Sequence, residues 1–177
     1  MDRPMPDVAF RGMSLMFSIR DFLSPRDSIL QEAGIQPGFR VLDYGCGPGA
    51  YVPGAAERVG ESGTVYALDL HPLAVQRVQA LARSRRLGNV ETICSDCETG
   101  LPDGSVDVVL LYDIFHMLSE PDVVLAELHR ILKVGGTLSV LDPHISQEQV
   151  VSGITCKQLF ELDKKEDRTY RFVKRKR

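Results

Sequence analysis

The chain has 177 residues, of which 44% are hydrophobic and 25% are charged, and its formal net charge at pH 7 is -3. This length suits one domain with a sizeable core, and the charge balance demands neither an acidic nor a basic partner. The longest apolar runs, such as 106–111, fall far short of the roughly 18 to 20 residues that a membrane span requires. No secretory signal is visible in the first residues, so we expect a cytoplasmic location.

The first segment, residues 1–24, contains apolar side chains without clear periodicity. It either packs on the body of the protein or forms a mobile lid over a site. Ser24 and Pro25 then supply an N-cap and a first helical proline, and Gly34 supplies a stop, which predicts a short helix over 25–33. We expect residues 25–177 to form a single domain.

The rest of the chain alternates between strand-like and helix-like segments. We expect strands over 40–44, 64–70, 90–94, 106–112 and 137–142, helices over 49–59, 72–87, 121–133 and 145–153, and a turn at 134–136. The tail breaks this rhythm, because 158–163 and 168–174 read as two strands joined by KKED. We interpret the basic end YRFVKRKR as a charged, exposed edge strand in preference to a nucleic-acid contact.

Strands that alternate with helices at this spacing predict an α/β, doubly wound fold with a mostly parallel sheet. The nearly unbroken apolar character of 106–112 is typical of a central strand that helices cover on both faces. The final hairpin is expected to close the sheet with an antiparallel strand.

A glycine-rich turn lies in the stretch 41–51, VLDYGCGPGAY, between the first strand of this sheet and the next helix. Glycines at positions 45, 47 and 49 let the backbone turn sharply and approach a ligand without a Cβ in the way. Such a turn before a helix N-terminus indicates nucleotide binding. The glycines alone leave open which nucleotide is bound.

Acids end three successive strands: Asp43, Asp69 and Asp96. Ligands of doubly wound sheets bind at the carboxyl ends of the strands, although a lone Asp there is often only a cap or turn former. Asp69 lies 20 residues after Gly49, the distance typical of a carboxylate that binds ribose hydroxyls. Asp43 would repel a pyrophosphate but suits a cofactor that carries a sulfonium and an ammonium group.

With these acids and glycines, the sequence resembles the class I S-adenosylmethionine-dependent methyltransferases, particularly the compact group with the ubiquinone/menaquinone-pathway enzymes. The acid-x-Gly-x-Gly-x-Gly motif, ALDLHPLAV, SDCETGLPDGSVDVV and VVLAELHRILKVGGTLSVLDP carry the resemblance, which covers roughly residues 25 to 175. It implies a Rossmann-like seven-stranded sheet of order 3-2-1-4-5-7-6 with strand 7 antiparallel. It also implies S-adenosyl-L-methionine as cofactor.

The resemblance assigns roles to individual residues. The methionine end of the cofactor would lie on Asp43 and the glycine turn, the ribose on Asp69, and the adenine beside Asp96, the backbone N–H of Cys97 and the apolar side chains of Leu68, Leu70 and Leu101. The implied cofactor-binding set is Asp43, Gly45, Cys46, Gly47, Gly49, Asp69, Leu70, Asp96 and Cys97.

The acceptor side is expected just after the fourth strand, at Tyr112, Asp113 and His116. Methyl transfer is an in-line displacement that needs positioning above all, and a base helps to remove a proton from some acceptors. His116 is the candidate base because histidine ordinarily titrates near neutral pH. Alternatively, His116 is a packing or hydrogen-bonding residue, and Asp113 only caps the segment. His144 is a further candidate for the wall of the acceptor site.

The sequence lacks the Asn/Asp-Pro-Pro-aromatic motif of the family's amino-methylating nucleic-acid enzymes, so we expect a small-molecule acceptor and no nucleic acid. Two other functions remain open. One is a catalytically idle domain that binds S-adenosylmethionine and regulates a partner. The other is an NAD-dependent oxidoreductase, because Gly45, Gly47 and Ala50 also satisfy a loose dinucleotide fingerprint, although Asp43 and Asp96 are then unexplained.

The chain contains four cysteines, and two of them, Cys94 and Cys97, form a C-x-x-C pair. Such pairs serve redox or metal chemistry in some proteins. The sequence offers no second C-x-x-C and no Cys/His pair at zinc-finger spacing. We therefore interpret the cysteines as structural and expect no metal site.

Overall fold

The computed structural model describes residues 26–175, so the lid hypothesis for residues 1–24 lies outside the described residues. The elements follow one another in the order α2 (Arg26–Glu32), β1 (Arg40–Tyr44), α3 (Val52–Val59), β2 (Thr64–Asp69), α4 (Pro72–Arg85), β3 (Val90–Cys94), β4 (Val106–Tyr112), the 3-10 helix η1 (Phe115–Met117), α5 (Pro121–Ile131), β5 (Leu132–Leu141), α6 (Gln147–Thr155), β6 (Phe160–Lys165) and β7 (Tyr170–Lys174). None of these helices is long and apolar enough to cross a membrane.

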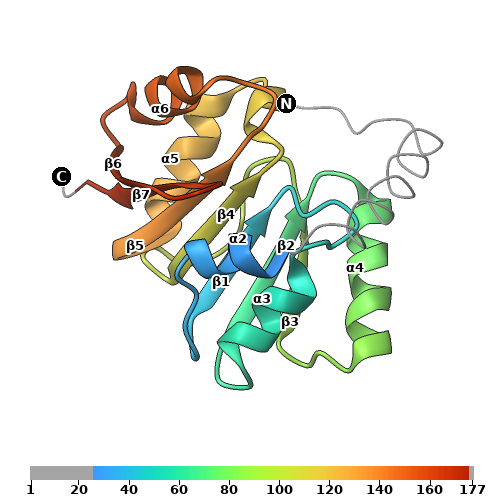
Figure 1. The fold of residues 1–177 in the computed structure, drawn as a ribbon. Helices are drawn as coiled ribbons and strands as arrows, with labels where there is room; N and C mark the ends of the chain where they lie inside the picture. The colour runs from blue at the N-terminus through green and yellow to red at the C-terminus, as the bar shows by residue number, and fades with distance from the viewer. Residues whose placement is uncertain (1–25, 176–177) are drawn as a thin grey trace.

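Within the described residues the strands form one seven-stranded sheet in the order β3-β2-β1-β4-β5-β7-β6 (Figure 1). The strands from β3 to β5 are parallel, and β7 runs antiparallel to both β5 and β6. The expected fold class and strand order are confirmed. The direction of winding reverses between β1 and β4, which is where a doubly wound sheet opens a crevice for ligands.

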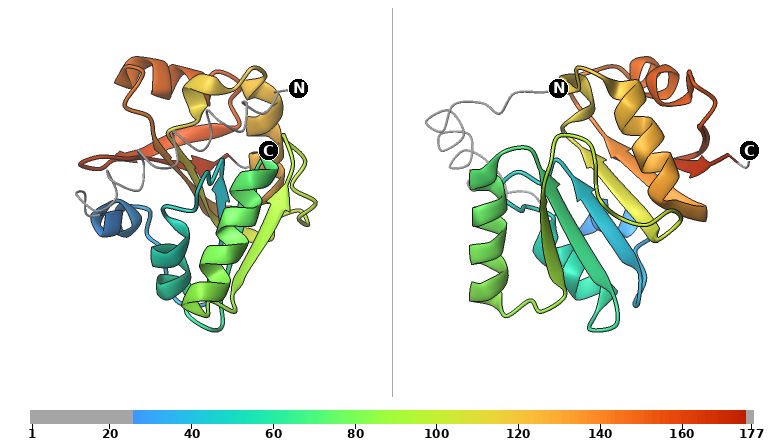
Figure 2. Two further views of the ribbon diagram at one scale, coloured as in Figure 1. Left: turned by 90° about the vertical axis from the view of Figure 1, so that its right-hand side faces the viewer. Right: turned by 180° about the vertical axis from the view of Figure 1, so that it is seen from behind.

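Helices cover both faces of the sheet (Figure 2). On β4, Val108, Leu110 and Tyr112 join the core under α2 and α3, whereas Val109 and Leu111 join the core under α5 and α6. Successive side chains of a strand point to opposite faces, so a strand that is buried on both sides must be apolar at almost every position. This is the physical reason for the unbroken apolar run in the sequence.

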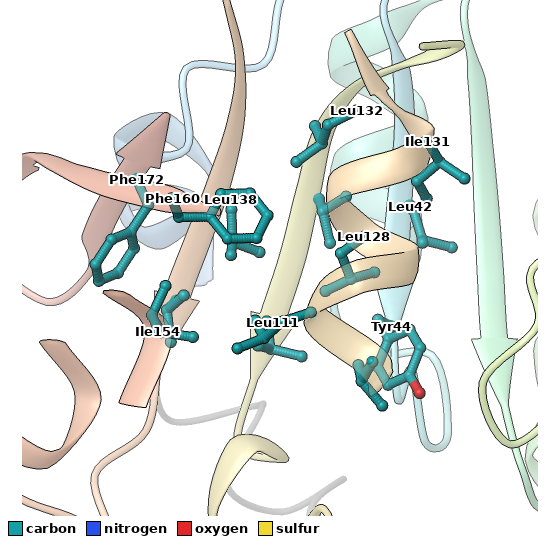
Figure 3. Close-up of a cluster of buried hydrophobic side chains, with 14 of the residues drawn as sticks. Leu42, Tyr44, Leu111, Leu128, Ile131, Leu132, Leu138, Ile154, Phe160 and Phe172 are labelled. Atoms are coloured by element: carbon teal, nitrogen blue, oxygen red, sulfur yellow. The ribbon is translucent and has the colours of Figure 1, made fainter. Parts of the chain in front are cut away.

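The β6–β7 hairpin is anchored by two phenylalanines that are fully buried, Phe160 and Phe172 (Figure 3). Both rings belong to the same core as Leu138 of β5 and Ile154 of α6. Burying a side chain of this size contributes about 2 to 3 kcal/mol relative to leaving it exposed. The hairpin is therefore part of the domain's core.

Two details differ from the expectations. The expected turn at 134–136 lies inside β5, which begins at Leu132; its pairing with β4 jumps from Val106–Leu132 to Val108–Thr137. The extra residues are accommodated as an irregularity of the ladder because Gly135 takes a positive φ of 79°. The basic strand β7 is also not the edge of the sheet: the edge is β6, whose residues are exposed after Phe160.

Candidate cofactor and acceptor site

The glycine turn lies over the carboxyl ends of β1 and β2. The backbone N–H groups of Gly45 and Cys46 donate hydrogen bonds of 2.8 and 2.9 Å to the carbonyl oxygen of Leu68, which ties the turn to β2. Gly45, Gly47 and Gly49 all have positive φ, at 75°, 51° and 87°. The three glycines are thus required by the backbone conformation, which other residues rarely adopt.

The three glycines face different surroundings. A methyl group at Gly45 would lie 2.9 Å from the side chain of Ile114, and one at Gly49 would lie 2.9 Å from Val78, so both positions are closely packed. A methyl group at Gly47 would meet no atom of the described residues within 4 Å. Gly47 is therefore the glycine that leaves room for a ligand to approach the backbone.

Asp43 is buried at the end of β1, with 2% of its surface exposed. Its Oδ2 atom has no hydrogen-bond partner among the described residues. Burial, followed by the nearby Asp69, raises the pKa of this carboxyl to about 7, and the charge of Arg26 opposes the shift. A cationic ligand stabilises the ionised form of such a carboxyl, because it supplies the missing opposite charge.

Asp69 joins the end of β2 to the glycine turn. Its Oδ2 accepts a hydrogen bond of 2.8 Å from the N–H of Gly47, and its Oδ1 accepts one of 2.8 Å from the N–H of His71. Burial raises the pKa of Asp69, and these two hydrogen bonds oppose the rise. Each carboxylate oxygen has a second lone pair, so both oxygens retain capacity to accept from the hydroxyls of a ribose.

Asp96 and Cys97 lie on the loop after β3, and the side chain of Tyr44 contacts this loop. The hydroxyl of Tyr44 donates a 2.8 Å hydrogen bond to the backbone oxygen of Asp96. The N–H of Cys97, expected to face the adenine, donates a long bond of 3.3 Å to Ser95. The sequence did not single out Tyr44, because nothing local shows that its ring reaches a loop 52 residues away.

The apolar candidates for the adenine wall divide into two groups. Leu68 is fully buried in the core, whereas Leu70 and Leu101 are half-buried. Cys46 is also buried, and burial raises the pKa of its thiol well above the ordinary value. Leu68 and the Cys46 side chain are therefore packing residues, although the backbone of Cys46 remains part of the turn.

All four cysteines fall within the described residues and are free thiols. Across residues 26–175, no group of three or more His, Cys, Asp or Glu side chains is arranged to hold a metal ion.

On the acceptor side, the three predicted residues differ in their surroundings. Tyr112 is buried, shares a hydrogen bond of 2.8 Å with the hydroxyl of Ser139, and packs its ring edge against Tyr51. Burial raises the pKa of the Tyr112 hydroxyl, so this group stays protonated and does not serve as a base. Asp113 takes a positive φ of 56°, and His116 bonds to Asp142.

A cavity of about 440 Å³ opens beside the glycine turn, at the carboxyl ends of β4 and β5. It reaches the turn through Tyr51, which directly precedes α3, and it reaches the end of β4 through Asp113. Its lining is Arg26, Ile29, Tyr51, Asp113, Leu141, Asp142, Pro143, Ile145, Arg168 and Tyr170. This volume and mixture of apolar, aromatic and charged groups are typical of a small-molecule site.

The comparisons with known proteins agree with this geometry. A family model described as "Methyltransferase domain" matches residues 42–140, which include the glycine turn, the carboxyl ends of β1 to β4 and most of β5. The chain belongs to this methyltransferase family. A crystal structure of a SAM-dependent methyltransferase from Aquifex aeolicus is similar to it at a TM-score of 0.80 and 25% identity, covering 96% of this chain and 100% of that one.

Two proteins named as methyltransferases are similar to this chain in sequence. Demethylmenaquinone methyltransferase from Geobacillus kaustophilus is 33% identical over 133 residues, 73% of this chain and 56% of that protein. Aklanonic acid methyltransferase DauC from Streptomyces sp. is 38% identical over 109 residues, 60% of this chain and 49% of that protein. The methyltransferase chain thus spans about half the length of these relatives.

The methyltransferase's cofactor is S-adenosyl-L-methionine (SAM), and the described residues fit it. The buried carboxyl of Asp43, whose Oδ2 has no partner among the described residues, suits the positive charges of SAM, and the open face of Gly47 leaves room for it at the turn. Asp69 stands between these two features with lone pairs to spare. When bound, the cofactor supplies an electrophilic methyl group on a sulfonium.

The open face of Gly47 makes a testable prediction. Gly47→Ala is expected to weaken binding of S-adenosylhomocysteine by about tenfold or more (~1.4 kcal/mol), because the added methyl group occupies ligand space. Gly104→Ala is the matched control, since Gly104 also has a positive φ, 58°, and open surroundings but lies outside the site. Both variants should lose roughly 1 to 2 kcal/mol of stability. Equal affinities of the two variants, by calorimetry, would contradict the assignment.

Proposed function

We propose that the protein transfers a methyl group from SAM to a small-molecule acceptor. The observation that carries this function is the buried Asp43 carboxyl directly before the glycine turn, whose Oδ2 has no hydrogen-bond partner among the described residues. The negative charge of Asp43 next to the turn favours a cationic methyl donor and disfavours the pyrophosphate of a dinucleotide. The adjoining cavity supplies a place for the second substrate.

The acceleration required of the protein is largely positional. The glycine turn, Asp43 and Asp69 hold the donor at the ends of β1 and β2, and the cavity holds the acceptor at the ends of β4 and β5. Fixing the two reactants in line at near-attack distance removes most of the entropic cost of a bimolecular displacement. Of the three residues expected on the acceptor side, Asp113 lines the cavity, whereas Tyr112 and His116 contact residues of its lining, Tyr51 and Asp142 respectively.

The acceptor class is supported by the names of the relatives. Demethylmenaquinone methyltransferase and aklanonic acid methyltransferase are both named for small organic acceptors. The cavity is of a matching kind, because two tyrosine rings, Tyr51 and Tyr170, line it. A nucleic acid is not expected as acceptor, and the cytoplasmic location and the lid role of residues 1–24 stay predictions.

Calorimetry with SAM, S-adenosylhomocysteine and NADH tests the proposal. We expect both adenosyl ligands to bind and NADH not to bind, because a pyrophosphate would lie beside Asp43. Binding of NADH alone would overturn the proposal in favour of an oxidoreductase. Transfer of a labelled methyl group into fractionated cell extract then distinguishes an enzyme from an idle SAM-binding domain, which would bind the cofactor and label nothing.

A further inference from the structure

The described sheet ends in two edge strands, β3 and β6, and these edges differ in charge. On β6, the residues that follow Phe160 are all exposed, and all of them except Leu162 are charged. On β3, Glu91 is the only charged residue, and Thr92 and Ile93 are half-buried. Natural sheets discourage pairing with other chains by placing charges on their edge strands. The β3 edge has little of this protection and is open to a further strand.

The pairing of β3 with β2 shows which of its hydrogen-bonding groups are left over. Before β3, the carbonyl oxygen of Asn89 accepts a 2.9 Å hydrogen bond from β2, and after β3 the N–H of Ser95 donates one of 3.2 Å to β2. Because parallel strands bond through alternate residues, the odd-numbered residues from 89 to 95 face β2. The N–H and C=O groups that face away from the sheet belong to the even-numbered residues, Val90, Thr92 and Cys94.

A groove lies between this edge and helix α4, which runs beside β3 (Figure 2). Its volume is about 420 Å³, and its lining is Gln79, Ala82, Arg83, Arg86, Leu87, Gly88, Val90 and Thr92. Gln79 Nε2 donates a 2.9 Å hydrogen bond to Thr92 Oγ1, which joins the helix to the strand. The groove shares no lining residue with the acceptor cavity, so it is a separate feature of the surface.

Helix α4 and the turn after it carry an unbalanced positive charge. Between residues 70 and 90 there are arginines at positions 77, 83, 85 and 86 and no aspartate or glutamate, whereas the whole chain has a net charge of -3. The ion pairs within residues 26–175 use other arginines. Arg83 and Arg86 are exposed and line the groove. An acidic ligand in the groove would therefore meet two guanidinium groups that make no ion pair within the described part of the chain.

Arg86 occupies a backbone position that ordinarily favours glycine. It follows α4 with φ 57° and ψ 38°, and the N–H of Leu87 closes the helix end by donating a 2.9 Å hydrogen bond to Ala82. Glycine is the usual residue at this point, because the left-handed conformation is unfavourable for a residue with a Cβ. Destabilising residues are commonly retained where function needs them. What glycine would lack here is the side chain that lines the groove.

We propose that the β3 edge and the α4 groove form a docking site for an extended acidic segment of a partner protein, which adds a strand to the sheet. Main-chain hydrogen bonds to the even-numbered residues of β3 supply affinity, and side chains supply specificity. The side chains of Val90 and Thr92 line the groove, whereas Ile93 packs on the opposite core. Side chains alternate across a strand. The added strand therefore carries acidic residues at alternate positions, facing Arg83 and Arg86, with apolar residues between them. This docking site is separate from the proposed methyl transfer.

Fluorescence anisotropy of labelled peptides with the full chain tests the docking site. The probe is a peptide of about eight residues in which glutamate alternates with valine. One control peptide carries lysine in place of glutamate, and another carries proline in place of a central valine. The glutamate peptide should bind the wild type at least about tenfold more tightly than either control at about 0.15 M salt. Equal binding of the lysine peptide would overturn the acidic chemistry, and equal binding of the proline peptide would overturn the added strand.

Substitutions on α4 locate the site. Arg83→Gln combined with Arg86→Gln should weaken binding of the glutamate peptide by about tenfold or more. The matched control, Arg77→Gln combined with Arg85→Gln, removes the same charge from the same helix outside the groove and should weaken it by less than about threefold. Equal losses in the two double variants would overturn the proposal.

Arg86→Gly separates a loss of binding from a loss of folding. This variant should weaken binding of the glutamate peptide by about threefold or more and yet raise the midpoint of thermal unfolding by about 2 to 4 °C, because glycine suits the left-handed conformation. An Arg86→Gly protein that binds the peptide as tightly as the wild type would overturn the role of this arginine.

Amide hydrogen exchange, measured by NMR on the full chain, identifies the strand that the peptide meets. The glutamate peptide should slow exchange at the outward amides of Thr92 and Cys94 by at least about tenfold, with a smaller change at Glu91 and Ile93, which face β2. Unchanged exchange at Thr92 and Cys94, or protection of β6 in their place, would overturn the proposal.

Two other occupants of the edge predict different results. A second copy of this chain would protect Thr92 and Cys94 without any peptide, and the protection would be lost on dilution. A nucleic acid as occupant would make a labelled single-stranded oligonucleotide bind more tightly than the glutamate peptide and compete with it. We expect neither result, because a second copy would bring like-charged arginines together and an oligonucleotide cannot pair with the edge as a strand does. Either result would overturn the assignment.

Discussion

Asp69→Ala is expected to weaken binding of S-adenosylhomocysteine by about 100-fold (~2.7 kcal/mol), as measured by calorimetry. The carboxylate has two tasks that the substitution removes together. It retains lone pairs for the ribose hydroxyls, and it holds the N–H of Gly47 at 2.8 Å. Hydrogen bonds to a charged group contribute about 1.5 to 3 kcal/mol each, so the loss of this group should exceed the effect of removing a neutral partner.

The control for Asp69→Ala is Glu91→Ala on the neighbouring strand β3, where the side chain is exposed. This variant removes the same charge from the same half of the sheet and should leave the affinity within about twofold. Thermal unfolding of both variants checks that the fold is retained. An Asp69→Ala protein that folds and binds with unchanged affinity would refute the ribose assignment.

Asp43→Asn is expected to stabilise the ligand-free protein and to weaken its binding of SAM. The pKa of Asp43 is raised from 3.8 to about 7, so the native state retains a proton between about pH 4 and 7 that the unfolded chain gives up. The contribution of this proton to the free energy of unfolding falls as pH rises from about 4 to about 7, and it is absent above about pH 7. At about pH 8 the ionised Asp43 is therefore a burden on the fold, and asparagine should raise the free energy of unfolding by on the order of 2 kcal/mol.

Two measurements check this expectation. Urea unfolding should show that the advantage of Asp43→Asn shrinks as pH is lowered from about 8 to about 5, because protonated aspartic acid and asparagine are then equivalent. The affinity of the wild type for SAM should rise as pH is raised from about 5 to about 8, because the cation binds the ionised form of the Asp43 carboxyl. A variant that is less stable than the wild type at about pH 8, or that binds SAM equally well, would contradict the role of Asp43.

The stability effect and the binding effect have opposite signs for one physical reason. A buried carboxylate without a hydrogen-bond partner costs free energy in the empty protein, and a cationic ligand recovers part of that cost. Natural binding sites commonly retain such destabilising groups where function needs them. The Asp43 carboxyl is a group of this kind, because its Oδ2 is left without a partner among the described residues.

Local patterns in the sequence were sufficient for the architecture and for the cofactor. The apolar run of β4, the Asp43 and Asp69 strand ends and the three glycines of the turn are all visible in short windows, because strand burial and positive φ restrict which residues fit. These patterns predicted the strand order and the SAM site through the family resemblance. They failed at 134–136, where a positive-φ glycine reads as a turn whether the chain leaves the sheet or bulges within it.

The tertiary structure decided the features that depend on residues far apart in the chain. Only the fold shows that Tyr44 supports the loop at Asp96, that the Asp43 carboxyl is buried beside Asp69, and that Asp142 holds His116 across 26 residues. Hydrogen bonds between side chains on different strands leave no periodic trace in a sequence, since each partner's own neighbours are compatible with many other positions. The glycine turn was therefore readable from the chain by itself, whereas the burial of Asp43 beside Asp69 and the contact between His116 and Asp142 required the folded sheet.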